Sequence, residues 1–144
     1  MKRLHVHLKV GDLDRSIDFY SALFGRGPDK READYAKWLL EDPAANVSIS
    51  NRAGEQGVDH VGVQVEDAAA LDAFAGRLRA AGEPVMQEED ATCCYARSHK
   101  YWTRSPEGAV WELFHTFGDS QIYGASPALQ PAEAGRAACC PPAA

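Results

Sequence analysis

The stretch HVHLKVGD, residues 5–12, is matched without a gap by HVGVQVED, residues 60–67. Both stretches begin with histidine, alternate polar and apolar residues, and end at an aspartate. Such alternation is typical of a β-strand with one buried face, and an aspartate directly after it is a good helix N-cap. The two stretches therefore predict the same strand-to-helix unit twice in one chain of 144 residues.

A helix is predicted after each of these strands. After Asp12, apolar residues recur at helical spacing up to a glycine at position 25: Leu13, Ile17, Tyr20 and Phe24. After residue 67 the same spacing recurs before Gly82 and Pro84, which end the pattern: Leu71, Phe74 and Leu78. Each helix therefore has its own start and stop signals.

Strand-like segments follow each predicted helix. In the first half, DYAKWLL (34–40) is joined by EDPAAN to VSISN, and in the second half KYWTR (100–104) is joined by SPEG to AVWELF. Proline and glycine in these links favour hairpin turns. We therefore expect an α+β protein of two strand–helix–three-strand (βαβββ) modules, residues 1–52 and 57–117.

The remaining residues, 118–144, are rich in alanine and proline and show no sustained periodicity. Such a composition predicts a flexible tail. It carries an adjacent cysteine pair, Cys139 and Cys140.

Composition excludes several classes of protein. The net charge of −6 disfavours a nucleic-acid partner, and no apolar run approaches the ~20 residues that cross a membrane. The N-terminal alternation is unlike a signal peptide, so we expect a cytoplasmic protein. Thiols stay reduced in that compartment, and the 4 cysteines therefore favour metal, metalloid or redox chemistry over disulfides.

Aligning the two modules predicts a metal site. His5 matches His60, and if Pro43 matches Pro106 then Ile49 matches Glu112. Glu112 shares a strand face with apolar neighbours, where a carboxylate is costly to bury without a cation. Two imidazoles and one carboxylate leave open coordination positions, which suits non-haem Fe(II) with dioxygen as co-substrate.

Other interpretations of these residues stay open. The three polar residues could be scattered at strand edges. His7 shares a strand face with His5 and is a rival metal ligand. The repeat favours His5 as the ligand, so His7 is expected either behind the ligands, without contacting the metal, or exposed to solvent. His99 and His115 lie outside the repeat and are expected at the surface or in packing.

Three stretches resemble the glyoxalase/bleomycin-resistance/extradiol-dioxygenase superfamily: HVHLKVGDLDRSIDFYSALFG, VDHVGVQVED and SPEGAVWELF. The resemblance covers the chain up to the predicted tail. It implies paired βαβββ modules that form a cup-shaped, mostly antiparallel sheet around a divalent metal. The superfamily includes isomerases, dioxygenases and metal-free binding proteins, so the fold does not select the reaction.

A narrower resemblance, to the arsenic-inducible carbon–arsenic lyases, is carried by YAKWLLEDP, TCCYA and KYWTRSPEGAVWELF. It implies an Fe(II)-dependent dioxygenase that converts trivalent organoarsenicals to inorganic arsenite. It also implies that His5, His60 and Glu112 are the catalytic iron ligands and that Cys93 and Cys94 bind arsenic.

Adjacent thiols suit this substrate, because both can bond to one soft As(III) atom. Cys139 and Cys140 could pass As(III) to this pair, or could be adjacent by chance. Lys100 and Tyr101 are candidates for the substrate pocket, and Trp102 is a candidate for either pocket or core. Cys93 and Cys94 could instead be small semi-buried apolar residues.

Three rival functions remain at this stage. One is a cadmium- or arsenic-binding protein without catalysis, and another is a metal-free antibiotic-binding protein. The third is a glyoxalase-I-like isomerase, which usually has four protein ligands, and Ile49 in place of the fourth counts against it. Modules that exchange between chains would give a homodimer.

Overall fold

The sheet in the computed structural model contains eight strands in the order β2-β3-β4-β1-β5-β8-β7-β6, with two helices outside it. The structure describes residues 1–125, and the elements in chain order are β1 (Arg3–Lys9), α1 (Leu13–Phe24), β2 (Lys30–Glu32), β3 (Tyr35–Glu41), β4 (Ala44–Ser50), β5 (Gly57–Gln64), α2 (Ala68–Ala80), β6 (Met86–Cys93), β7 (Ala96–Arg104) and β8 (Val110–Asp119). The predicted α+β fold with two βαβββ units is confirmed. Within residues 1–125, neither helix has the length and apolarity that a membrane crossing requires.

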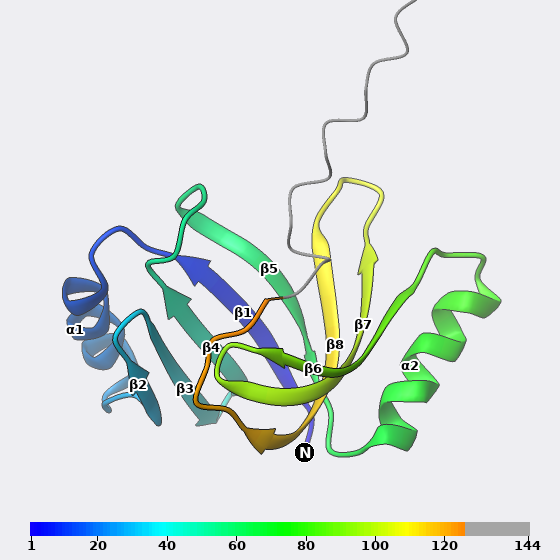
Figure 1. Ribbon diagram of the computed structural model, residues 1–144, viewed down its shortest axis with the longest axis horizontal. Coiled ribbons are helices and arrows are strands. Elements are labelled where there is room, and N and C mark those ends of the chain that lie inside the picture. Colours follow the sequence, from blue (N-terminus) through cyan, green and yellow to red (C-terminus); the bar gives the residue numbers. More distant parts are fainter. Residues whose placement is uncertain (126–144) are drawn as a thin grey trace, which may run out of the picture.

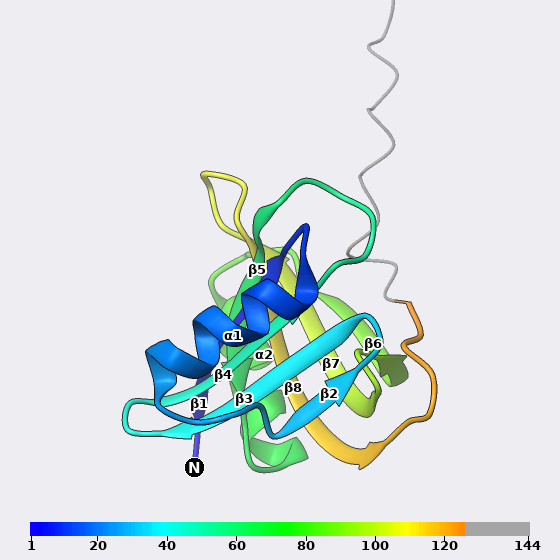
Figure 2. The ribbon, with the colours of Figure 1, turned by 90° about the vertical axis from the view of Figure 1, so that its left-hand side faces the viewer.

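Local signals explain where both helices begin. The Asp12 side chain accepts a hydrogen bond from the Arg15 backbone N–H, and Asp67 does the same for Ala70. Helix α1 ends at Gly25, whose φ of 70° is left-handed and therefore suits glycine. Figure 1 shows the helices at opposite sides of the molecule, and Figure 2 shows α1 lying across the strands of the first half.

The two halves join through β1 and β5. These strands run antiparallel at the centre of the sheet, and each lies parallel to the last strand of its own module, β4 or β8. Leu8 and Val10 of the first half pack with the α1 core, which places His5 and His7 on the opposite, concave face. The first histidine of both modules is therefore buried inside the curve of the sheet.

The register of the last strands corrects one sequence prediction. Gly62 pairs with Glu112 in the second half, and the equivalent residue His7 pairs with Ser48 in the first half. Ser48, not Ile49, is therefore the counterpart of Glu112. The hairpin links differ in length, so the match of Pro43 with Pro106 is shifted by one residue. A shift of one residue reverses the face, and Ile49 lies in the α1 core.

Part of the predicted tail is ordered against the sheet. Strand β8 continues to Asp119, and Gly124 forms a bridge with Cys93. Figure 1 shows this segment, in orange, between the two sides of the curved sheet. Cys139 and Cys140 lie outside the described residues.

Gly62 provides the first testable prediction. It pairs with His5 on one side and Glu112 on the other, and an added Cβ would lie 2.1 Å from the Glu112 carbonyl oxygen. The Glu112 backbone could relieve this clash only if strand β8 moved away from β5. We predict that Gly62→Ala lowers the free energy of unfolding by about 1–3 kcal/mol or more, measured by chemical denaturation.

Gly76→Ala is the matched control. It lies within α2 with nothing inside 4 Å of an added Cβ. Relief of glycine's backbone entropy should stabilise the protein by about 0.5–1 kcal/mol. Equal effects of the two substitutions would contradict the close packing of β5 against β8.

Candidate metal and thiol site

Three buried side chains from three neighbouring strands converge at the centre of the cup. His5 Nε2 lies 3.2 Å from His60 Nε2 and 3.4 Å from Glu112 Oε2, and His60 Nε2 lies 3.3 Å from the same oxygen. These atoms form a nearly equilateral triangle of possible metal ligands. Gly62 lies between His5 and Glu112 in the register and contributes no side chain.

The triangle fits a single divalent cation. Ligand atoms bound about 2.0–2.2 Å from one ion, at angles between octahedral and tetrahedral values, stand about 2.8–3.6 Å apart. All three edges fall in that range. The three residues could therefore hold a metal without rearrangement of the backbone.

Hydrogen bonds fix both imidazoles in the ligating orientation. His5 Nδ1 lies 3.0 Å from the Asn46 carbonyl oxygen, and His60 Nδ1 lies 2.8 Å from Asp59 Oδ2. Because both partners are acceptors, each Nδ1 carries a proton and each Nε2 is the nitrogen that faces the triangle. Sequence reasoning missed Asp59, although its position directly before His60 was the available signal.

Glu112 has a second partner on its other oxygen. Lys100 Nζ donates to Glu112 Oε1 at 2.5 Å, and both groups are buried. Burial alone would raise the pKa of Glu112, but Lys100 and His60 hold it well below its usual range. The carboxylate is therefore ionised and can face a cation with Oε2.

The imidazoles differ in protonation. Burial lowers the pKa of His5 to about 4, against the opposing effect of Glu112. Burial would also lower the pKa of His60, but its hydrogen bonds to Asp59 and Glu112 raise it to about 9. A cation at the triangle must therefore replace a proton on His60 at neutral pH.

The turn between β6 and β7 explains how two adjacent cysteines act together. Neighbouring residues on a strand point to opposite faces. Here Cys93 ends β6, while Cys94 and Tyr95 have φ of 58° and 59°. Both are left-handed, as in a type I′ turn that usually contains Asn-Gly. The turn brings the two Sγ atoms to 3.2 Å, within reach of one bound atom.

The thiols and two of the three possible metal ligands line one cavity. Its walls include Cys93, Cys94, His5, Lys100 and Glu112, and it encloses about 30 Å³ of solvent space. Its lining thus joins the turn to the centre of the sheet. Lys100, predicted as a pocket residue, lies between the two groups.

The two thiols differ in acidity. The hydrogen bond from Cys93, aided by Lys100, lowers the pKa of Cys94 to about 7 against the effect of burial. The same hydrogen bond and burial raise the pKa of Cys93. Cys94 is therefore the reactive thiol at neutral pH.

Other predicted residues lie elsewhere. The Tyr101 hydroxyl donates to Asp72 and its ring packs in the α2 core, so Tyr101 does not line the cavity that contains the thiols. Trp102 is buried and contacts His60 edge-on, with ring centroids 5.4 Å apart. His99 packs against Phe117.

His7 is buried rather than exposed. Its two ring nitrogens lie 2.7 Å from Ser48 Oγ and 2.9 Å from Ser50 Oγ, and its ring stacks on His60. Both nitrogens are occupied, so His7 is not a free ligand here. It fills the position that Gly62 leaves empty in the other half.

Sequence reasoning also missed a cluster of tyrosines beside the thiols. The rings of Tyr35, Tyr95 and Tyr123 lie 5.6–6.1 Å apart by centroid. Cys94 Sγ donates to the Tyr123 hydroxyl at 3.6 Å, and Arg52 lies over the Tyr123 ring at 3.9 Å. Tyr123 comes from the segment that was predicted to be a tail.

The fold and this arrangement define a member of a known class. The family model described as "Glyoxalase/Bleomycin resistance protein/Dioxygenase superfamily" matches residues 2–113. The chain belongs to this superfamily.

Individual relatives are more specific. The chain is 38% identical over 144 residues to a protein of Thermomonospora curvata named "Trivalent organoarsenical cleaving enzyme", covering 99% of this chain and 90% of the relative. It is 34% identical to "Cadmium-induced protein CadI" of Mycobacterium tuberculosis, covering 97% and 93%. Among solved structures, the 2,3-dioxygenase LapB of Pseudomonas sp. KL28 has a TM-score of 0.63 at 21% identity, covering 82% of this chain and 42% of that one.

The orientation of His60 by Asp59 provides a second prediction. Asp59→Asn should weaken the binding of a divalent metal about 10–100-fold, because the amide fixes the imidazole tautomer less strongly. Anaerobic titration calorimetry measures this. Asp119→Asn removes the same charge from a side chain that is 85% exposed and should leave binding unchanged. Equal affinities for the Asp59→Asn variant and the parent would contradict this role.

The thiol acidities provide a third prediction. In a Cys139→Ser, Cys140→Ser background, alkylation of Cys94 should reach half its maximal rate near pH 7. A lower pKa means more thiolate at neutral pH and faster reaction. Cys93→Ala removes the hydrogen bond and should move the midpoint to higher pH, as followed by mass spectrometry. An unmoved midpoint would show that Cys93 does not acidify Cys94.

Proposed function

We propose that this protein cleaves the carbon–arsenic bond of trivalent organoarsenicals and releases inorganic arsenite, with Fe(II) at His5, His60 and Glu112. The observation that carries the proposal is the single cavity lined by the thiol pair, His5 and Glu112. The names of relatives at 38% and 44% identity support the substrate class. The reduced thiols that this chemistry needs favour the cytoplasm.

The metal site has the composition of a two-histidine, one-carboxylate triad. When bound, Fe(II) would supply open coordination positions for dioxygen chemistry. The protein's part is to keep Glu112 ionised through Lys100 and to orient both imidazoles through Asn46 and Asp59. The contacts that do this are present in the structure.

The thiols bind and orient the substrate. A monosubstituted arsenical, R–As(OH)₂, exchanges both hydroxyls for Cys93 and Cys94 sulfur and releases two waters. The remaining carbon substituent is then held in one direction from the turn. Orientation of this kind contributes roughly 7–11 kcal/mol to the most favourable intramolecular reactions.

The overall reaction with the simplest substrate balances without an external reductant. Methylarsonous acid and dioxygen give formaldehyde and arsenous acid: CH₃As(OH)₂ + O₂ → CH₂O + As(OH)₃. Arsenic stays trivalent, and the carbon supplies the four electrons that reduce dioxygen. Protons can be held at Lys100 Nζ, which is buried beside Glu112 and the thiols.

The decisive experiment starts with anaerobic protein loaded with Fe(II). After addition of dioxygen and methylarsonous acid, one arsenite and one formaldehyde should form for each dioxygen consumed. Arsenic speciation measures the arsenite, and an oxygen electrode measures the dioxygen. Arsenical binding without dioxygen consumption would favour the second candidate, a cadmium- or arsenic-sequestering protein. That candidate rests on the thiol pair and on the relative named "Cadmium-induced protein CadI".

The structure favours neither remaining rival. An isomerase with four protein ligands would need one at Ser48, whose hydroxyl is hydrogen-bonded to His7. A metal-free antibiotic-binding cup would not need a ligand triangle. Pairing of β1 with β5 completes the cup within one chain, so the proposed site needs no second copy.

Thiol replacement provides a fourth prediction. Cys93→Ser with Cys94→Ser should abolish organoarsenical binding at the site while Fe(II) affinity stays within about twofold, because hydroxyls are poor ligands for soft As(III). The Cys139→Ser, Cys140→Ser protein is the matched control and should keep turnover. Unchanged arsenical affinity in the first variant would remove the thiol assignment.

A further inference from the structure

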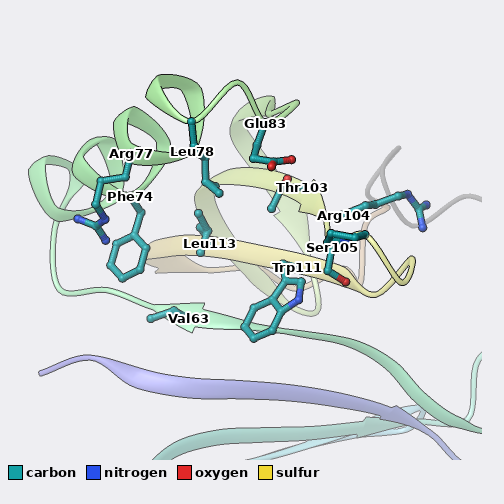
Figure 3. Close-up of a pocket in the computed structure, with 12 residues that line it drawn as sticks. Val63, Phe74, Arg77, Leu78, Glu83, Thr103, Arg104, Ser105, Trp111 and Leu113 are labelled. Atoms are coloured by element: carbon teal, nitrogen blue, oxygen red, sulfur yellow. The ribbon is translucent and has the colours of Figure 1, made fainter.

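A second pocket lies on the opposite, convex face of the sheet. It has a volume of about 480 Å³ and lies between α2 and strands β5, β7 and β8. Figure 3 shows Phe74 and Leu78 of the helix above it and Val63 and Trp111 of the sheet below it. Glu112, next to Trp111 on β8, points to the other face. This pocket is therefore separate from the metal and thiol site.

The equivalent place in the first half is filled by an indole. The Trp38–Val47 pair lies one residue before Ser48, and the Thr103–Trp111 pair lies one residue before Glu112. Thr103 is therefore the counterpart of Trp38. Trp38 is fully buried in the α1 core, beside the rings of Tyr20 and Phe24.

Smaller side chains leave this space open in the second half. Thr103 replaces Trp38, and by the same register Ser105 replaces Leu40, which packs in the α1 core. Trp111 replaces Val47 and forms the floor rather than filling the space. The pocket's volume falls within the ~300–1,000 Å³ typical of small-molecule sites, and its lining is largely apolar.

A cation at one end of the rim favours an acid there. Arg77 stands at that end and forms no ion pair within residues 1–125. Arg104, next to Thr103 on β7, points away from the pocket (Figure 3). Arg77 lies over the Phe74 ring at 4.3 Å, which keeps one cation beside the apolar wall. Glu83 is the one carboxylate among the lining residues. The rim thus carries one cation beside Phe74 and one anion near Thr103, at the other end (Figure 3).

We propose that this pocket binds a small aromatic acid with an indole-sized ring, independently of the metal and thiol site. The ring would occupy the space that Trp38 fills in the other half. The acid group would lie at the rim beside Arg77. A cationic aromatic compound of the same size should bind less well.

Titration calorimetry with indole-3-acetate and tryptamine tests the proposal. The full chain should bind indole-3-acetate, and Thr103→Trp should weaken this about tenfold or more by filling the pocket. Thr103→Val keeps the side-chain size and should retain binding. Ala81→Phe fills the same pocket from the helix and serves as the second blocking variant if Thr103→Trp does not fold.

Each further outcome is decisive. The blocking variants should bind Fe(II) and methylarsonous acid as the parent does, because the metal and thiol site lies on the opposite face of the sheet from this pocket. Binding of indole-3-acetate that survives both blocking variants, or no binding by the parent, would overturn the site. Tighter binding of tryptamine than of indole-3-acetate would overturn the assignment of an acid.

Discussion

The antiparallel pairing of β1 with β5 is the constraint on which the rest of the structure depends. It places His5 opposite Gly62 and His7 opposite His60, so both module-leading histidines enter the same concave space. Parallel pairing of β5 with β8 then places Glu112 beside Gly62. The resulting triangle of ligand atoms requires that residue 62 have no side chain. Backbone pairing therefore determines both the position and the size of the candidate metal site.

A second constraint is the left-handed turn at Cys94 and Tyr95. Non-glycine residues in this conformation cost of order 1–3 kcal/mol each, and such residues gather at functional sites. The conformation holds two sulfurs 3.2 Å apart at the edge of the cavity. Tyr123 contacts one of them from a segment that pairs with the end of β6. Three parts of the chain thus position the thiol pair: strand β6, the turn that contains Cys94, and the segment after β8 that contains Tyr123.

The repeat made much of this predictable. Alternation and capping residues located both modules. The match of residues 5–12 with residues 60–67 identified His5 and His60 as equivalent positions. The assignment of Ile49 failed because hairpins of different length shift the register by one residue, which no proline match can detect. Lys100 and Tyr101 could not both face the thiol cavity, because neighbouring residues of β7 point to opposite faces of the sheet. Contacts between distant segments, such as Tyr123 with Cys94, leave no local pattern in the sequence.

One measurement tests the central claim most directly: X-ray absorption at the iron and arsenic edges of one anaerobic sample. The sample is the Cys139→Ser, Cys140→Ser protein with Fe(II) and a phenylated trivalent arsenical. The account predicts iron bound by nitrogen and oxygen, with the scattering of two imidazoles, and arsenic bound by two sulfurs and one carbon. Sulfur in the iron shell, or arsenic bound by oxygen in place of the two sulfurs, would contradict it.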